Sequence, residues 1–167
     1  MKFAYADPPY IGQAKRHYGK HRDYSGEVDH AKLIERLEGD YDGWALSASI
    51  RSLPILMRLL PNDILTLAWC KPMAPPMGDH LHYSWEPVLI RQLRKPKGYE
   101  RMHLVLSPPG FTFRDKPAEH VIGEKPEGFL HWVLRCCGVL ATDEFYDLFP
   151  GSGACMRAWD TYRGLLL

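Results

Sequence analysis

The sequence predicts an α/β domain in which a mostly parallel sheet lies between two layers of helices. Apolar runs typical of strands alternate along the chain with segments typical of helices, and this alternation indicates crossover units on a parallel sheet. Fourteen prolines and fourteen glycines interrupt the chain often, which suits short elements joined by functional loops. With 167 residues, 46% of them apolar, the chain is long enough for one buried core and too short for two.

Six short apolar-rich runs are typical of strands. The first of them stops at Asp7-Pro8-Pro9-Tyr10, where two consecutive prolines end a strand in a rigid turn. The expected strands are Lys2–Ala6, Gly43–Ser49, Asp63–Lys71, Trp85–Leu93, Met102–Ser107 and Glu144–Phe149.

Three further segments and the C-terminal residues are expected to be helical. In the first segment Ala31, Ile34 and Leu37 fall on one stripe of a helix, which Gly39 closes. Pro54 is tolerable in the second segment because it lies near the first turn. The expected helices are Val28–Glu38, Ile50–Leu60, Glu127–Gly138 and a short one in the last residues.

The chain is expected to form one domain over residues 1–167, with a small basic insertion at about residues 72–123. A Pro/Gly-rich stretch, Pro72–Asp79, opens this insertion, and a loop-like segment, Pro108–Gly123, closes it. The sequence contains no internal repeat and no low-complexity segment.

Charge and hydropathy exclude several classes of protein. The 21 Lys and Arg residues nearly balance the 20 Asp and Glu residues, so the chain is neither a polybasic-tail protein nor an acidic disordered one. No apolar run approaches the roughly 18 residues that span a bilayer, and the N-terminal sequence lacks the basic and long apolar regions of a signal peptide. We therefore expect a cytoplasmic protein without a membrane partner.

The four cysteines are expected to be buried thiols in a reducing compartment. Cys136 and Cys137 are adjacent inside an apolar run, and no Cys-x-x-Cys spacing occurs. A zinc site built from cysteines with His80 and His82 is the alternative, but no ligand pair has the spacing of a closed zinc site. We therefore expect no metal. The cysteines are Cys70, Cys136, Cys137 and Cys155.

The end of the first strand carries unusual chemistry. The prolines of Asp7-Pro8-Pro9-Tyr10 fix φ at two positions and remove two backbone donors. The Asp7 carboxylate and the Pro8 carbonyl can therefore both point outward as acceptors from a stiff frame, beside an aromatic ring. Such a cluster suits a planar, uncharged group with an amino substituent, because acceptors hold the NH2 and the ring stacks on its face. The alternative is a surface tyrosine after a proline-rich turn.

The end of the last strand is the second unusual segment, residues 147–153 (DLFPGSG). An acidic strand end followed by Gly-x-Gly lets a ligand approach the backbone closely, above the N-terminus of a following helix. By itself the pattern is weak, because such a turn is often only a tight connection. It is not the G-x-G-x-x-G dinucleotide fingerprint, because Met156 stands where the third glycine would fall.

Taken together, these motifs resemble the S-adenosylmethionine (SAM)-dependent amino-methyltransferases, which methylate the exocyclic amine of adenine or cytosine in nucleic acids. ADPPY resembles their catalytic motif, DLFPGSGA their cofactor-binding glycine loop, and Lys125-Pro126 with its apolar helix the segment ahead of that loop. The catalytic motif comes first and the glycine loop last, as in the circularly permuted branch of the family. The resemblance implies a Rossmann-like three-layer sandwich in the permuted methyltransferase topology.

The start of the chain is also similar to the mRNA-adenosine-methyltransferase-like branch, where a DPP-aromatic motif precedes a basic loop containing His-Tyr, as His17-Tyr18 does here. The sequence departs from that branch in having Tyr10 rather than Trp and in keeping the full Gly-Ser-Gly loop. DNA-directed and RNA-directed activity both stay open.

The family resemblance implies direct, in-line methyl transfer without a covalent intermediate or a metal. The catalytic residues would be Asp7, Pro8, Pro9 and Tyr10: the Asp7 carboxylate and the Pro8 carbonyl hold the amine hydrogens, and Tyr10 stacks on the base. Adenine N6 in DNA is the implied target, with cytosine N4 or RNA adenine as alternatives. The residues implied to bind SAM are Asp7, Lys125, Asp147, Phe149, Gly151, Ser152 and Gly153.

Family members often continue past the glycine loop to a strand whose acidic end binds the ribose hydroxyls, whereas here only residues 154–167 follow. Asp160, Thr161 or Tyr162 would have to substitute. The alternative function is a non-catalytic methyltransferase-like subunit with an incomplete cofactor pocket. Methylation of a small molecule or a protein amide also fits DPPY chemistry, but it leaves the basic patches unexplained. Glu86 is interpreted as a strand-edge residue rather than a catalytic one.

Nucleic-acid contacts are expected from two basic patches, because the whole chain is nearly neutral. Residues 11–26 carry a net charge of +3 and residues 91–116 one of +5, both with interleaved aromatic residues. We expect DNA rather than RNA as the partner, and a homodimer or partner subunit as a source of sequence specificity. The expected nucleic-acid-binding residues are Lys15, Arg16, Tyr18, Lys20, Arg22, Arg94, Lys95 and Lys97.

Overall fold

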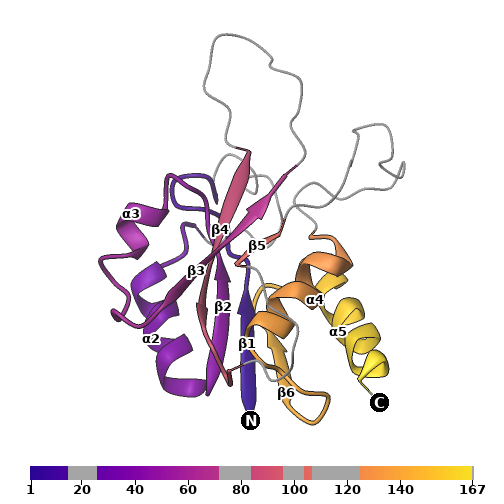
Figure 1. Cartoon of the computed structure of the whole chain (residues 1–167). Coiled ribbons are helices and arrows are strands. Elements are labelled where there is room, and N and C mark those ends of the chain that lie inside the picture. Colours follow the sequence, from indigo (N-terminus) through magenta and orange to yellow (C-terminus); the bar gives the residue numbers. More distant parts are fainter. Residues whose placement is uncertain (15–25, 72–83, 96–103, 107–124, 167) are drawn as a thin grey trace, which may run out of the picture.

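In the computed structural model a six-stranded sheet lies between two layers of helices (Figure 1). The structure describes residues 1–14, 26–71, 84–95, 104–106 and 125–166. The strands are β1 (Lys2–Ala6), β2 (Gly43–Ser47), β3 (Leu65–Cys70), β4 (Trp85–Arg91), β5 (Val105–Leu106) and β6 (Glu144–Asp147). The helices are α2 (His30–Asp40), α3 (Leu53–Leu56), α4 (Glu127–Cys136) and α5 (Ala154–Leu165).

The sheet is mostly parallel, as the sequence predicts. Its strand order is β5-β3-β4-β2-β1-β6, and only β4 runs antiparallel to its neighbours β3 and β2. The carboxyl ends of the other strands therefore meet at one edge of the sheet, together with the amino end of β4. We call this the carboxyl edge, and the opposite one the amino edge.

Two separate apolar cores flank the sheet because strand side chains alternate between its faces. On β1, Phe3 and Tyr5 pack against α4 and α5, whereas Ala4 and Ala6 face α2 and α3. These four β1 residues are fully buried, so the first strand lies in the middle of the molecule. Burial on both faces explains why its sequence is a continuous apolar run instead of an alternating one.

The expected elements are all present, with shifted ends. Helix α2 begins at His30 because the Asp29 side chain accepts a hydrogen bond from the Lys32 amide and caps it. Helix α3 is much shorter than the expected Ile50–Leu60. After Leu56 the backbone tightens into turns with i→i−3 hydrogen bonds, from the Arg58 amide to the Ile55 carbonyl among others, so the helix does not continue.

The segment expected to be an insertion contributes to the centre of the sheet. Strand β4 lies between β3 and β2, and its Leu89 and Ile90 are fully buried. Residues 72–83, 96–103 and 107–124 of that segment lie outside the described residues. No helix among the residues that the structure describes is long and apolar enough to cross a membrane.

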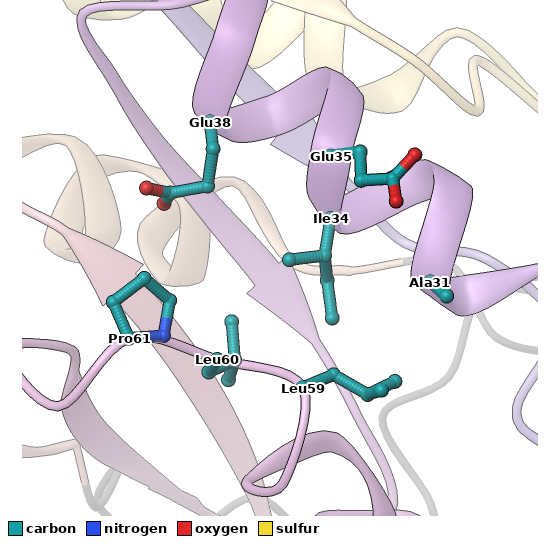
Figure 2. Close-up of a pocket in the computed structure, with 7 residues that line it drawn as sticks. All are labelled: Ala31, Ile34, Glu35, Glu38, Leu59, Leu60 and Pro61. Carbon is teal, nitrogen blue, oxygen red and sulfur yellow. The ribbon is translucent and has the colours of Figure 1, made fainter.

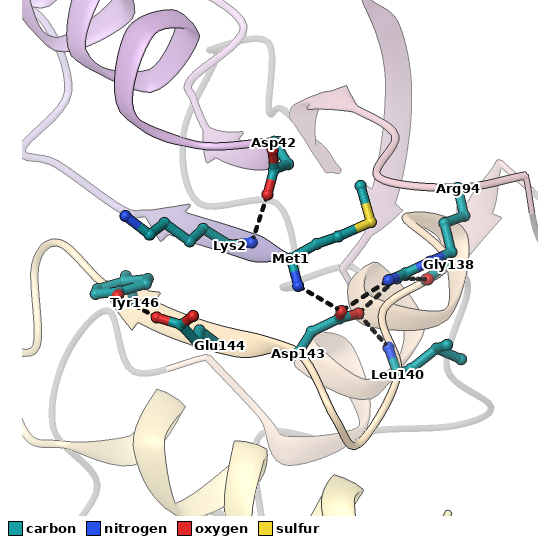
Figure 3. A network of polar contacts seen from close by, with 9 residues as sticks. All are labelled: Met1, Lys2, Asp42, Arg94, Gly138, Leu140, Asp143, Glu144 and Tyr146. Carbon is teal, nitrogen blue, oxygen red and sulfur yellow. Dashed lines mark hydrogen bonds and ion pairs between the residues drawn. The ribbon is translucent and has the colours of Figure 1, made fainter.

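A polar network joins the elements at the amino edge (Figure 3). Asp143, whose side chain is 1% exposed, accepts hydrogen bonds from both terminal nitrogens of Arg94, from the Leu140 amide and from the α-ammonium of Met1. The amide of Lys2 donates to the exposed Asp42 carboxylate, 2.7 Å away. The network ties the start of β1 to the start of β6 and to the residues after β4.

Candidate active site

The proline motif and the glycine loop leave the same edge of the sheet on adjacent strands. β1 pairs in parallel with β6, with Tyr5 opposite Asp147. The Leu148 amide donates to the Tyr5 carbonyl at 2.9 Å and extends this pairing past the end of β6. Asp7 follows Tyr5 by two residues, and the loop that contains Gly151 follows Asp147 at once, so both motifs border one region above the carboxyl edge.

Asp7 lies at this edge in an ion pair with a buried lysine. Its Oδ2 is 2.7 Å from Nζ of Lys125, and the lysine side chain is only 7% exposed. Lys125 lies two residues before the start of α4. Burial raises the pKa of Asp7, and the Lys125 ammonium opposes this effect by favouring the ionised form. Lys125, expected to bind the cofactor carboxylate, is thus engaged by Asp7.

Glu86 is the residue that sequence reasoning assigned to a strand edge and that the structure brings into the site. One of its carboxylate oxygens pairs with the ammonium of Lys71. The other accepts from the Tyr10 hydroxyl at 3.0 Å and lies 3.9 Å from Nζ of Lys125. Two carboxylates and two ammonium groups therefore form one connected cluster beside the Tyr10 ring. We call Asp7, Tyr10, Lys71, Glu86 and Lys125 the edge cluster.

The sequence contains a pattern that could have predicted Lys71 as a site residue, but none that could have predicted Glu86. Lys71 ends the expected strand Asp63–Lys71, and a polar residue at the carboxyl end of a parallel strand is a site candidate. Glu86 stands at the start of its strand, where this rule does not apply. Its position depends on the reversed direction of β4, which brings the amino end of that strand to the same edge.

Aromatic rings lie close to the ammonium groups of the edge cluster. Nζ of Lys125 is 5.9 Å from the ring centroids of both Tyr10 and Trp69, and Nζ of Lys71 is 5.0 Å from the Trp69 ring. The Trp69 ring in turn packs on Phe129 of α4, with centroids 4.7 Å apart. The core on the α4 side thus supports the site from below.

The acidic end of β6 contains an unsatisfied buried oxygen. Oδ1 of Asp147 accepts from the Phe149 amide at 3.1 Å, whereas Oδ2 is buried without a hydrogen-bond partner among the described residues. Burial raises the pKa of Asp147, the Phe149 amide opposes this, and the negative charge of Asp7 adds to the increase. A buried carboxylate oxygen without a partner is costly, so this atom fits a ligand that brings a donor or a positive charge.

The loop after β6 has a backbone that only glycine adopts readily. Gly151 has φ of 47° and Gly153 of 76°, both in the left-handed region. Among the described residues, a Cβ at Gly151 would meet only the Phe149 carbonyl oxygen, at 3.9 Å, so that part of the chain leaves the space over the loop open. Phe149 itself packs against the core on the α2 side, and the Ser152 carbonyl accepts from Arg157 at 2.8 Å.

These features fit the methionine part of SAM. Its ammonium would satisfy Oδ2 of Asp147, and its chain would pass over the open glycine loop. On the ribose side, two of the three residues suggested as substitutes have other contacts. The hydroxyl of Tyr162 is buried and donates to the Val139 carbonyl, and that of Thr161 donates to the Arg157 carbonyl. Asp160 is exposed on α5.

Two of the expected nucleic-acid contacts, Arg94 and Lys95, lie away from the edge cluster. Arg94 is bound to Asp143 at the amino edge (Figure 3), the opposite end of the sheet from Asp7. Lys95 is the next residue in the chain. Because β4 is antiparallel, the chain that leaves it emerges away from the site, so these two residues do not flank it. The other expected contacts lie outside the described residues: Lys15, Arg16, Tyr18, Lys20, Arg22 and Lys97.

A shallow hollow of about 330 Å³ lies elsewhere, between α2 and the segment before β3. Its walls are mostly apolar, with Glu35 and Glu38 of α2 facing residues Leu59, Leu60 and Pro61 (Figure 2). Glu38 accepts hydrogen bonds from Arg91 and from the Trp44 indole, both at its Oε1. The hollow contains no member of the edge cluster.

The fold resembles that of a solved SAM complex. The chain superposes on a crystal structure of the M1.HpyAVI–SAM complex with a TM-score of 0.58 and 16% identity, covering 97% of this chain and 78% of that one. A crystal structure of M1.HpyAVI gives a TM-score of 0.59 and 17% identity over 96% of this chain and 76% of that one. The chain has a methyltransferase-like fold. No protein-family model and no curated protein matches the sequence.

Proposed function

We propose that this protein transfers a methyl group from SAM to the exocyclic N6 of adenine in DNA. The observation that carries the proposal is the shared edge: the Asp7-Pro8-Pro9-Tyr10 turn and the Gly151–Gly153 loop follow paired strands. Oδ2 of Asp147, which has no partner among the described residues, lies at the start of that loop. A methyltransferase-like fold with a neighbour crystallised with SAM supports the choice of cofactor. The order of the motifs, proline turn first and glycine loop last, would be the permuted arrangement.

When bound, SAM would supply the methyl group from its sulfonium sulfur, which would leave as a neutral thioether as the S–C bond breaks and the N–C bond forms. The chain's own residues would orient the nucleophile, which is a poor one because its lone pair is delocalised into the base. The Asp7 carboxylate and the Pro8 carbonyl would accept the two amine hydrogens and direct the lone pair toward the methyl carbon. Positive charge develops on the nitrogen during transfer, so these oxygens lower the barrier, and Asp7 then accepts the proton.

The remaining site residues would bind base and cofactor. Tyr10 would stack on a base flipped out of the duplex or offered by a single strand. Asp147 would bind the ammonium of the cofactor, and Gly151, Ser152 and Gly153 would line its methionine part, with Phe149 beside them. Lys125 would keep the Asp7 carboxylate ionised against the effect of burial. Cytosine N4 and RNA adenine are the other targets that this geometry accepts.

The proposal is tested by incubating the protein with labelled SAM and a mixture of DNA and RNA, followed by nucleoside analysis. We expect N6-methyladenine from DNA. The Asp7→Asn variant should lose transfer by at least a hundredfold while keeping the fold, because the amide keeps the shape but not the charge. Absence of both N6-methyladenine and N4-methylcytosine at saturating SAM would refute the proposal.

A second candidate is a non-catalytic methyltransferase-like subunit that binds nucleic acid or regulates a partner. The hydroxyls of Tyr162 and Thr161 favour it, since both have partners within the protein. Of the three residues expected on the ribose side, only the exposed Asp160 is then left. A thermal shift distinguishes the two candidates. A competent SAM site raises the melting temperature by mass action as SAM is added, whereas an incomplete pocket gives no shift.

A further inference from the structure

Glu86 is the acidic residue of the edge cluster that the proposed chemistry leaves without a role. It stands second in β4, opposite Trp69 of β3, and its side chain is 18% exposed. It does not belong to either motif, and no step of methyl transfer requires a second carboxylate. Its contacts nevertheless join both halves of the cluster, so they need a physical explanation.

Both carboxylate oxygens of Glu86 are occupied by groups from different elements. Lys71, after β3, pairs with one oxygen, and the Tyr10 hydroxyl, after β1, donates to the other at 3.0 Å. Lys125, before α4, lies 3.9 Å from that second oxygen. Glu86 is thus the point at which the ends of three segments, far apart in sequence, are held together.

The bond to Glu86 restricts the Tyr10 ring. Two prolines stiffen the backbone ahead of Tyr10, but they do not restrict its χ1 and χ2 angles. A hydrogen bond from the hydroxyl to a charged acceptor fixes the far end of the ring, and hydrogen bonds to charged groups are the strong ones. Lys71 in turn fixes the carboxylate, so the orientation of the ring is set from the neighbouring strands.

We infer that Glu86, held by Lys71, is a positioning residue that fixes the Tyr10 ring in the orientation that receives a planar base. The inference rests on the proposed function, in which Tyr10 stacks on the target base. Glu86 acts through Tyr10 and touches neither the methyl group nor the cofactor. It therefore governs the affinity for the base-containing substrate more than the affinity for SAM.

The kinetic test compares Glu86→Ala, Glu86→Gln and Tyr10→Phe. We expect Glu86→Ala and Tyr10→Phe each to raise the KM for an oligonucleotide about tenfold, the usual size of a lost hydrogen bond to a charged group. The Kd for SAM should change less than twofold. Because both variants break the same contact, the double variant should be no more than about twofold worse than either single one. Glu86→Gln, which keeps an acceptor oxygen, should recover part of the loss.

Glu38→Gln is the matched control. Glu38 is also a partly buried carboxylate with an ion pair and a neutral donor, Arg91 and the Trp44 indole, but it lies on the amino-edge side of α2. Glu38→Gln should lower the thermal stability of the protein about as much as Glu86→Gln does, and it should leave the KM for the oligonucleotide unchanged. An unchanged KM in Glu86→Ala, or fully additive losses in the double variant, would overturn the inference.

A measurement without substrate separates this inference from the proposed function. In protein labelled with [13C]tyrosine, the Tyr10 ring signal is identified by its loss in Tyr10→Phe. The chemical shift of this signal should differ from wild type in Glu86→Ala. In Glu86→Gln it should lie close to the wild-type value, and in Glu38→Gln it should equal that value. If the wild-type protein methylates no nucleic acid, the proposed function fails while this shift still supports the positioning role. A Tyr10 signal that does not respond to Glu86→Ala refutes the positioning role.

Discussion

Replacing Asp143 by asparagine should destabilise the protein in a pH-dependent way. Burial alone would raise the pKa of Asp143, but hydrogen bonds from Arg94, the Leu140 amide and the Met1 ammonium outweigh it and lower the pKa from 3.8 to about 2. The side chain is 1% exposed, so solvent screens these contacts little. Because one pKa unit corresponds to about 1.4 kcal/mol, the ionised carboxylate contributes about 2 kcal/mol to the free energy of unfolding.

The sign of the pH dependence follows from a folded pKa that lies below the unfolded one. The contribution is complete above about pH 5 and decreases as the pH falls through 3.8 toward 2, with about half of it lost by pH 3. At pH 7, Asp143→Asn should therefore lose at least about 2 kcal/mol, and more if Arg94 is left without a partner in a partly buried place. At pH 3 the difference from wild type should be about half as large.

Urea unfolding followed by circular dichroism at pH 7 and pH 3 measures both values. The matched control is Asp42→Asn in the same part of the fold, because this carboxylate is exposed and accepts only from the Lys2 amide among the contacts described. It should change stability by less than about 0.5 kcal/mol at either pH. An Asp143→Asn variant as stable as wild type at pH 7, or one with the same deficit at both values, would refute the electrostatic reasoning.

Three further predictions concern the site. Asp147→Asn should weaken SAM binding at least tenfold by calorimetry, whereas Asp42→Asn, an exposed position at the amino edge, should change it less than twofold. Equal effects would contradict the role of the unsatisfied oxygen. Burial raises the pKa of Asp147 and so disfavours its ionised form. SAM affinity should therefore fall as the pH is lowered through that pKa. An affinity that does not change between pH 7 and 4 would contradict the role of the Asp147 carboxylate. Gly153→Ala should cost about 1 kcal/mol in thermal unfolding, because φ at this position is 76°, whereas Gly164→Ala inside α5 should be neutral or stabilising.

The sequence by itself determined which segments form strands and helices and where the two motifs lie. A continuous apolar run such as Lys2–Ala6 predicts a buried strand, and Asp7-Pro8-Pro9 ends it without help from the rest of the molecule. The apolar stripe of α2 and the Gly-x-Gly turn at 151–153 are equally local. Because β1 and β6 end in recognisable turns, even their common edge followed from the expectation of a parallel sheet.

Only the tertiary structure decided the direction of β4 and the partners of the charged side chains. Reversing one strand exchanges the edges at which its two ends lie. Glu86 is therefore at the site and Arg94 at the opposite edge, although both lie in or next to the same predicted strand. Lys125 pairs with Asp7 across 118 positions of sequence, a distance over which no local pattern is informative. Coulombic and hydrogen-bonding contacts act over a few ångströms in space, and which side chains come that close is set by strand order and packing.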